Sequence, residues 1–505
     1  MAKRPGSIAE AFILNANSTP AKLCMRFDGE EWTYRRLRER AENFATALKA
    51  SGLRPGERVA LFLGNCPDFL AAYLGTHLAG GVVVPVNTQY RKAELRHIFG
   101  DAGVRACLTD SNVRQELEGV RGDLSDLKKV VEVGEDLEDF LGGASSTYEP
   151  ELPSGEDLAA IAYTSGTTGR SKGAMLLHRN LVANIKAVCE AWRWTADDHL
   201  LLSLPLFHVH GLMVGAHGTF FTGASAELHR KFDAATLYDA LLSGRVTMFF
   251  GVPTMYTRLL REAEVREERP RPLRLYVSGS APLSPQAFEE FEHLFGERIL
   301  ERYGMTETIM NLTNPYDGER KPGTVGMPFP GQEARVVDVK SRERLPAGEV
   351  GEIEVRGPHV FAGYWNRPDA TEESFDEDGW FRTGDLGYVD EDGYFVISGR
   401  AKELIISGGY NVYPREVEEA IEGCPGVSEV AVVGLPDPEY GERVVAAVVR
   451  DDPSLSAGKV AEFCREGLAS FKKPREVVFV DELPRNALGK VLKHEVRDRL
   501  IEREE

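Results

Sequence analysis

The chain has 505 residues, 42% of them hydrophobic and 28% charged, and its 79 acidic against 60 basic residues give a net charge of −19. This composition is typical of a globular protein with more than one domain, and the acidic balance argues against a general nucleic-acid-binding protein or a partner of anionic membranes. No apolar run approaches the roughly 20 residues of a membrane span, no signal-peptide core follows the start, and the six cysteines form no C-x-x-C pair. We therefore expect a cytoplasmic enzyme with free thiols.

Strand and helix signals alternate through the first half of the chain. A strand at 58–62, a helix at 67–78 and a strand at 82–85 form a βαβ unit, whose helix ends at Gly80-Gly81. The alternation recurs, with strands expected at 200–204, 247–250 and 273–277 and helices at 212–221 and from Thr254. This pattern predicts a mainly parallel, helix-covered sheet that binds ligands beyond the carboxyl ends of its strands.

The most informative segment is Thr164-Ser165-Gly166-Thr167-Thr168-Gly169-Arg170-Ser171-Lys172-Gly173. Its glycines let the backbone come close to a ligand, its hydroxyls and amides donate hydrogen bonds, and Lys172 adds a charge for phosphate oxygens. Apolar strands at 158–163 and 174–177 flank it, so we expect a hairpin loop and not a Walker P-loop. The alternative is a flexible surface turn.

Three further polar clusters follow predicted strands or turns. In Tyr303-Gly304-Met305-Thr306-Glu307 an aromatic ring could stack on a base, a hydroxyl could hold a phosphate and a carboxylate could bind Mg²⁺. Ser278-Gly279-Ser280 leaves room for a planar ring, and the Asp385 carboxylate of Thr383-Gly384-Asp385 suits two ribose hydroxyls. The alternatives are a helix capped by Thr306, a β-to-α turn and an ordinary Asp turn.

The pattern of predicted strands and helices changes in the last third of the chain. Short alternating strands after Gly323 indicate a β-rich subdomain, and a small α+β pattern follows from about Gly399. It has helices at 414–421 and 458–468 and strands at 427–433, 443–449 and 476–480. We expect an α/β protein with a large N-terminal domain at 1–398, a hinge at 399–403 and a small, mobile C-terminal domain at 404–505.

Taken in order, these segments resemble the motifs of the adenylate-forming enzymes, the superfamily of acyl-CoA synthetases, luciferases and adenylation domains, from Tyr163 to Lys490. The resemblance to the acyl-CoA synthetases implies two steps. A carboxylate attacks the α-phosphorus of MgATP to give acyl-AMP and pyrophosphate, and the CoA thiol then releases AMP. The substrates implied are a small carboxylic acid, ATP and CoA, with Mg²⁺ as cofactor and no nucleic acid or membrane.

The same resemblance implies roles for individual residues. Lys490, after Pro484-Arg485, is the implied catalytic lysine, and the charged, non-packing Lys402 is the implied hinge residue. Glu307 and Thr167 are the implied magnesium ligands. The residues implied to line the CoA tunnel include the paired glycines and are Ser407, Gly408, Gly409 and Tyr410. The implied ATP contacts are Thr164, Ser165, Gly166, Thr167, Thr168, Gly169, Lys172, Gly279, Tyr303, Thr306, Glu307, Asp385, Arg400 and Lys490.

Segments 252–259 and 301–331 resemble malonyl-CoA synthetases in particular. That resemblance implies that Arg258 and Ser280 hold a distal carboxylate, with Met305 in the acyl pocket. His208, beside the pocket, is a second catalytic candidate. A buried arginine needs a partner, although Arg258 could also lie on the outer face of its helix. The prediction is a malonate or methylmalonate CoA ligase. The alternatives are a ligase for a medium-chain or aromatic acid, a stand-alone adenylation domain that loads a carrier protein, and a non-catalytic relative.

Overall fold

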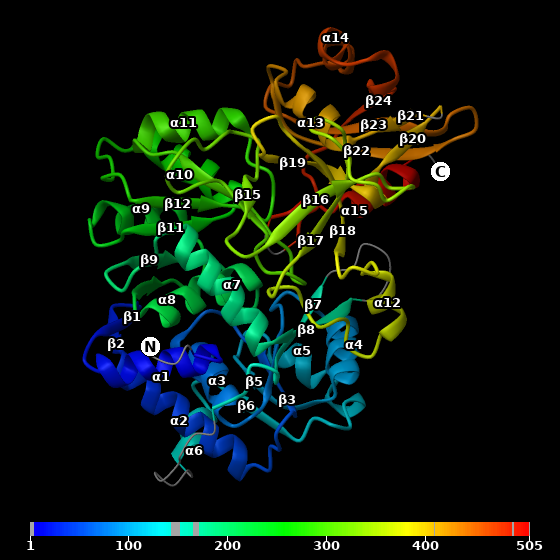
Figure 1. The fold of residues 1–505 in the computed structure, drawn as a ribbon. Helices are drawn as coiled ribbons and strands as arrows, with labels where there is room; N and C mark the ends of the chain where they lie inside the picture. Colours follow the sequence, from blue (N-terminus) through cyan, green and yellow to red (C-terminus); the bar gives the residue numbers. More distant parts are fainter. Residues whose placement is uncertain (1–4, 143–151, 165–170, 409, 487–488, 504–505) are drawn as a thin grey trace. The chain divides into compact units, whose positions relative to one another are not determined.

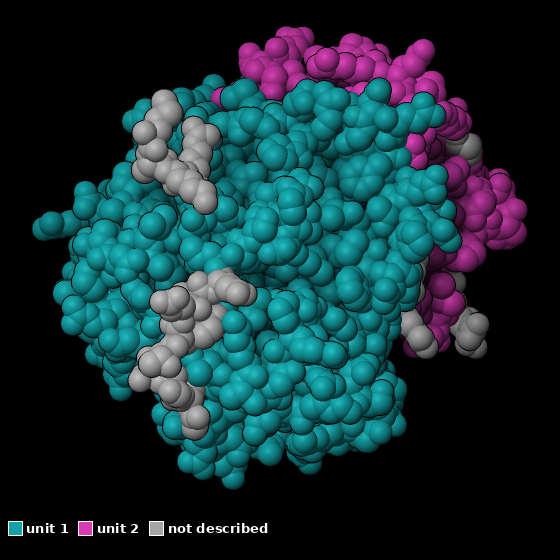
Figure 2. Space-filling model, turned by 60° about the horizontal axis from the view of Figure 1, so that its bottom comes forward, with its two compact units in different colours: residues 1–322, 326–333, 355–381 teal, residues 323–325, 334–354, 382–505 magenta. Residues whose placement is uncertain are grey.

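The computed structural model describes residues 5–142, 152–164, 171–408, 410–486 and 489–503. The chain divides into two compact units (Figure 2). Unit 1 comprises residues 1–322, 326–333 and 355–381, and unit 2 comprises 323–325, 334–354 and 382–505. The expected hinge at 399–403 therefore lies inside unit 2, and the domain boundary stays a prediction. Within the described residues, no helix is long and apolar enough to cross a membrane.

Unit 1 contains a six-stranded sheet in the order β6-β5-β3-β4-β7-β8 (Figure 1). The predicted βαβ unit is confirmed, because β3 and β4 pair in parallel on either side of α3. Among the described strands of this sheet, β7 and β8 are antiparallel and the other pairs are parallel. Its strands are β3 (Arg58–Phe62), β4 (Val82–Pro85), β5 (Val104–Thr109), β6 (Lys129–Glu132), β7 (Leu158–Thr164) and β8 (Lys172–Leu177).

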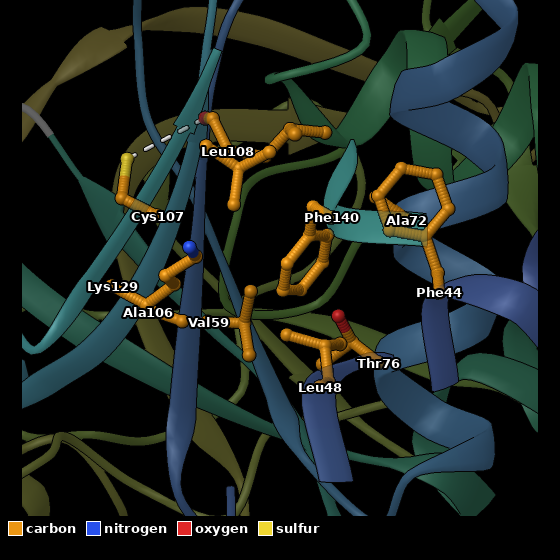
Figure 3. A pocket seen from close by; sticks show the side chains of 11 residues that line it. Phe44, Leu48, Val59, Ala72, Thr76, Ala106, Cys107, Leu108, Lys129 and Phe140 are labelled. Carbon is orange, nitrogen blue, oxygen red and sulfur yellow. Dashed lines mark hydrogen bonds between the residues drawn. The ribbon is translucent and has the colours of Figure 1, made fainter. Parts of the chain in front are cut away.

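Helices cover both faces of this sheet, as the near-continuous apolar strands require. On one face α4 and α5 pack on side chains such as Ala60 and Phe62, while α2, α3 and α6 pack on the alternate face through Val59. The second layer leaves an apolar cavity of about 10 Å³ (Figure 3). That volume is about what a single water molecule needs, so the cavity is a packing gap and not a substrate site. The helices are α2 (Tyr34–Ala50), α3 (Pro67–Leu78), α4 (Lys92–Ala102), α5 (Arg114–Glu118) and α6 (Leu137–Gly142).

A nine-stranded sheet completes unit 1, in the order β15-β14-β13-β12-β11-β9-β10-β1-β2. Its strands are β1 (Leu23–Phe27), β2 (Glu30–Thr33), β9 (His199–Leu202), β10 (Ser225–Leu228), β11 (Met248–Gly251), β12 (Leu275–Ser278), β13 (Ile299–Tyr303), β14 (Leu312–Thr313) and β15 (Met327–Pro328). Its centre, from β13 to β1, is parallel. The helices are α1 (Ile8–Ser18), α7 (His178–Ala191), α8 (His217–Thr222), α9 (Ala234–Leu242), α10 (Pro253–Val265), α11 (Pro285–Phe295) and α12 (Pro368–Glu373). The single helix expected at 212–221 is instead a π-helix, His210–Ala216, that continues into α8.

Unit 2 holds two smaller sheets. The first has the order β16-β17-β18-β19, and its strands are β16 (Glu333–Val337), β17 (Gly351–Arg356), β18 (Phe381–Val389) and β19 (Phe395–Arg400). The second has the order β21-β20-β23-β22 with β24 beside β23, and its strands are β20 (Ile405–Ser407), β21 (Tyr410–Val412), β22 (Val427–Asp437), β23 (Gly441–Arg450) and β24 (Glu476–Phe479).

The long hairpin of β22 and β23 divides the core of unit 2 by strict alternation. Val432 and Ala446 face α13 and α14, whereas Val433 and Val445 face α15. The α+β pattern expected for this part of the chain is confirmed. The helices are α13 (Pro414–Glu422), α14 (Ala457–Gly467) and α15 (Lys493–Glu502).

Candidate active site

The loop predicted to bind an anion joins β7 to β8, and the antiparallel pairing of Thr164 with Lys172 confirms the hairpin. At the base of the loop, His97 Nε2 lies 2.8 Å from the Ser171 carbonyl oxygen. The Lys172 ammonium lies 4.5 Å from the centroid of the Tyr364 ring, a cation–π contact. The tip, which includes five predicted ATP contacts, lies outside the described residues: Ser165, Gly166, Thr167, Thr168 and Gly169.

Glu307 lies in a turn that follows β13, and not in a helix capped by Thr306. The carboxylate is buried, and the Tyr364 hydroxyl donates a 2.8 Å hydrogen bond to its Oε1. Gly304 makes the turn possible, because a Cβ there would lie 1.9 Å from the Ile309 carbonyl oxygen. Tyr303, Met305 and Thr306 remain half-buried beside it.

The described residues contain no group of three or more His, Cys, Asp or Glu side chains that could hold a metal ion. A single buried carboxylate nevertheless fits Mg²⁺, which keeps several waters and is usually bound through one or two carboxylates together with substrate phosphates. Glu307 therefore fits an ion that arrives with a nucleotide. It does not fit a closed protein cage.

Arg302, which sequence reasoning missed, lies on β13 directly before Tyr303 and is 3% exposed. Its Nη2 is 3.3 Å from the Ser280 hydroxyl, and its Nε has no hydrogen-bond partner among the described residues. Burial lowers the pKa of the guanidinium to about 9, and no neighbouring carboxylate opposes that effect within the described part of the chain. The group stays charged at neutral pH, and an uncompensated buried cation costs several kcal/mol. The arrangement of Arg302 and Ser280 therefore suits an anionic ligand.

The sequence contained a signal for Arg302. The charged pair Glu301-Arg302 interrupts an otherwise apolar strand of a helix-covered sheet, where a charge is expected only for a reason. Gly279 makes room for the guanidinium, because a Cβ at that position would lie 2.6 Å from its central carbon. Ser280 itself has φ of +73°, a strained conformation of the kind that clusters at ligand sites.

His208 and His210 lie near this arginine. Burial, with a smaller contribution from the positive charge of Arg302, lowers the pKa of His208 to about 4 and that of His210 well below its ordinary value. Both rings are therefore neutral at neutral pH. His210 is buried, and neither of its ring nitrogens has a hydrogen-bond partner among the described residues. A neutral His208 could accept a proton, so its predicted catalytic role stays open.

Of the two positions considered for Arg258, buried or exposed, the structure shows the exposed one. The Arg258 side chain is exposed on α10, so burial does not force it to find a carboxylate partner. The apolar side of that helix is formed by Met255, Tyr256 and Leu259, which are buried. The buried cation of this region is Arg302. A contact between Arg258 and substrate remains a prediction.

In unit 2, the predicted ribose ligands Asp385 and Arg400 face each other across β18 and β19. Arg400 Nε is 2.9 Å from Asp385 Oδ1. Asp385 lies within β18 and not in an ordinary Asp turn. Lys490 lies close enough to interact electrostatically with both. Partial desolvation by the surrounding protein and repulsion from Arg400 lower its pKa, although part of the side chain is exposed.

The hairpin that carries Lys490 is tied at both ends. The backbone N–H of Lys490 donates to Asn486 Oδ1 at 3.0 Å, and Leu492 N–H donates to the Pro484 carbonyl at 2.8 Å. Lys493, at the start of α15, is 2.7 Å from Glu418. The backbone at Lys490 and at Leu492 is therefore fixed by hydrogen bonds.

The remaining predicted positions also lie in unit 2. Lys402 is exposed in a short 3₁₀ turn, Ala401–Glu403, at the end of β19. Ser407 is buried on β20, and Gly408 adopts φ of +59°. Tyr410 is 59% exposed and stacks on Phe471, with ring centroids 4.7 Å apart. Gly409 lies outside the described residues.

A sequence profile described as AMP-binding enzyme matches residues 12–365, and a second, described as the AMP-binding enzyme C-terminal domain, matches residues 416–490. The chain belongs to the AMP-binding enzyme family. It is 34% identical to a malonate–CoA ligase from Arabidopsis thaliana, over 99% of this chain and 90% of the relative. It is 37% identical to a feruloyl-CoA synthase from an Amycolatopsis species, over 96% of this chain and 98% of the relative.

A solved structure of ATP-bound MatB from Rhodopseudomonas palustris superposes on this chain with a TM-score of 0.91. The two sequences are 42% identical, over 97% of this chain and 98% of that one. These similarities confirm the adenylate-forming family and its α/β fold, which the order of motifs predicted.

Proposed function

We propose that this chain is an AMP-forming CoA ligase that converts malonate or methylmalonate, ATP and CoA into the acyl-CoA, AMP and pyrophosphate. The observation that carries the choice of acid is the buried Arg302 beside Ser280. A site for a simple fatty or aromatic acid needs apolar walls, and a buried cation there would be left without a partner. The distal carboxylate of a dicarboxylic acid is that partner, and a guanidinium can bind it through two parallel hydrogen bonds.

The first step brings two anions together, so positioned cations carry most of the catalysis. We assign to Lys490 the contact with the reacting carboxylate and the α-phosphate, and to Lys172 and the loop at 164–169 the β- and γ-phosphates. Asp385 and Arg400 would share the ribose hydroxyls, and Tyr303, Gly279 and Thr306 would line the rest of the nucleotide. Mg²⁺, held by Glu307 and Thr167, would neutralise charge on the leaving pyrophosphate.

The second step requires access for the CoA thiol. We propose that the C-terminal domain rotates about Lys402 between the two steps, so that the residues around 407–410 take the place of Lys490 at the acyl-adenylate. Lys402 suits a pivot because a charged, exposed residue can absorb a backbone rotation without loss of core contacts. His208 is neutral and half-buried, which suits a gate or a proton acceptor for the thiol.

The six cysteines are free, as expected of a cytoplasmic protein.

A panel of acids scored by pyrophosphate release tests the proposal. Malonate and methylmalonate should be used with the highest kcat/KM, and acetate, propionate, octanoate and ferulate should be used at least ~10²-fold less well, because each leaves Arg302 unpaired. A preference for a monocarboxylic acid would refute the assignment to malonate but not the ligase chemistry.

A second candidate is a ligase for an aromatic acid, since the feruloyl-CoA synthase is 37% identical to this chain. Ferulate in the panel decides between the two. A carrier-loading adenylation domain would instead accept a holo carrier protein in place of CoA, and the same assay with that acceptor tests it.

A further inference from the structure

Tyr364 touches both of the charged residues proposed to act on the phosphates of ATP. Its hydroxyl donates a 2.8 Å hydrogen bond to Glu307 Oε1, and the bond is buried. The face of its ring lies 4.5 Å from the Lys172 ammonium. A single side chain therefore connects the carboxylate after β13 with the lysine at the start of β8, although the three residues are far apart in the sequence.

The backbone around Tyr364 fixes this position. Trp365 N–H donates to the Gly173 carbonyl at 2.8 Å, and Met175 N–H donates to the Gly363 carbonyl at 2.9 Å, so residues 362–365 run along the outer edge of β8. On the other side, Phe361 N–H donates to the Glu307 carbonyl at 2.9 Å. The segment is thus bonded both to the exit of the phosphate loop and to the residue that carries the carboxylate.

We propose that Tyr364 is a positioning residue that orients the Glu307 carboxylate through its hydroxyl and holds Lys172 at the base of the phosphate loop through its ring. A phenol that donates to one carboxylate oxygen restricts rotation of the whole group, which sets the direction of its remaining lone pairs. The ring meanwhile holds the ammonium from one side, so that the N–H groups of Lys172 on the other side can donate to a phosphate. This inference rests on the proposed function, which assigns Mg²⁺ to Glu307 and the phosphates of ATP to Lys172.

The two contacts predict different effects for two substitutions. Tyr364→Phe removes the hydroxyl and keeps the ring, so it should raise the Mg²⁺ concentration needed for half-maximal stabilisation by a non-hydrolysable ATP analogue by ~10-fold, the value of one hydrogen bond to a charged group. It should leave binding of the analogue without metal unchanged. Tyr364→Leu also removes the ring and should weaken metal-free binding several-fold. Thermal-shift titrations with Mg²⁺ and with the analogue measure both quantities without turnover.

A double-mutant cycle separates positioning from a general structural role. In a Glu307→Gln background, Tyr364→Phe should change the Mg²⁺ midpoint by less than ~2-fold, because the group that it orients no longer carries the charge. Tyr34→Phe is the matched control: Tyr34 is also buried, and its hydroxyl donates to the Thr219 and Ala224 carbonyls at 2.9 and 2.8 Å. It should lower the melting temperature and leave the Mg²⁺ midpoint unchanged.

The inference is overturned if Tyr364→Phe leaves the Mg²⁺ midpoint unchanged, or shifts it equally in both backgrounds. Tyr364→Phe alone decides the matter if Tyr364→Leu does not fold. A failure of the proposed function is seen separately, as a wild-type protein that releases no pyrophosphate with any acid of the panel.

Discussion

Arg302 in unit 1 and Arg400 in unit 2 are both expected to meet substrate, yet their surroundings are opposite. Arg302 is 3% exposed, and no carboxylate pairs with it among the described residues. The Arg400 side chain is 33% exposed and pairs with Asp385 at 2.9 Å. The unpaired charge of Arg302 lowers the stability of the ligand-free protein and leaves a cation available for an anionic ligand. The pair of Arg400 and Asp385 is stable without ligand, and Asp385 must bind both Arg400 and the ribose when a nucleotide is present.

The largest effect is expected from Lys490→Ala in unit 2. Loss of a cation that is needed only as charge develops at phosphorus should lower the rate of adenylation by ~10³-fold. Formation of malonyl-CoA from supplied malonyl-adenylate should change less than ~3-fold, since that step has no attack on phosphorus. Single-turnover assays of the two half-reactions measure this, and an equal loss in both would contradict the proposed role.

Arg302→Met and Arg400→Met test the contrast between the two arginines directly. Arg302→Met should lower kcat/KM for malonate by ~10² to 10³-fold and raise the melting temperature, because it removes an unpaired buried charge. Arg400→Met should lower the melting temperature, because Asp385, 3% exposed, then loses this ion pair. Calorimetry and acid-panel kinetics give both readouts.

The two arginines near the proposed acyl site can be separated in the same way. Arg258→Leu should weaken malonate use far more than use of short monocarboxylic acids if the exposed Arg258 side chain also contacts the distal carboxylate. An equal effect on both classes would assign the carboxylate to Arg302 and Ser280 without Arg258. For Arg302→Met, a lower melting temperature would contradict the inference that the unpaired charge of Arg302 destabilises the ligand-free protein.

Sequence reasoning succeeded where the determinants are local. The β7–β8 hairpin follows from apolar flanks around a glycine-rich loop, whereas the roles of Glu307 and Asp385, which rest on motif order, stay predictions. Sequence reasoning did not single out Arg302 or Tyr364, because the contacts from which we propose their roles are made across the fold. The Tyr364 bond to Glu307 spans 57 residues. Burial of Arg302 depends on which face of β13 is covered, and the exposure of Arg258 depends on which side of α10 packs. Spacing alone cannot supply that information.

The two units should also differ in acid stability. His77, His178 and His217 are buried in unit 1, and burial lowers the pKa of His77 to about 4 and the pKa values of the other two well below the ordinary value. Unit 2 contains one histidine, His494, which is exposed. Below pH ~6.5 the unfolded chain binds protons that folded unit 1 does not, so unit 1 loses stability as the pH falls from 6.5 towards 4.

At pH 5 the loss should be ~2 kcal/mol from His77 alone. All five tryptophans lie in unit 1, so their fluorescence in urea follows that unit, while hydrogen exchange in β22 and β23 follows unit 2. The midpoint for unit 1 should fall between pH 7 and pH 5, and protection in unit 2 should be nearly constant. Parallel changes in both units would contradict the assignment. His217→Gln is a useful variant, because its amide could still bond the Tyr73 hydroxyl, which lies 2.7 Å from His217 Nε2, and it cannot be protonated.

The smallest effect is expected at the apolar cavity between β3, α2 and α3 (Figure 3). Val59→Ile adds one methylene to a wall of this cavity, and a fully buried methylene contributes at most ~0.8 kcal/mol. The cavity is only about 10 Å³, so part of that gain will be offset by crowding, and a rise of ~0.5 kcal/mol or less is expected. The values of kcat and KM for malonate and ATP should be unchanged, because the cavity is lined mainly by apolar side chains and is too small for a substrate, in contrast to the site of Arg302. A change in KM on filling the cavity would mean that substrate binding depends on the packing of this layer, and the proposed division between packing gap and ligand site would then fail.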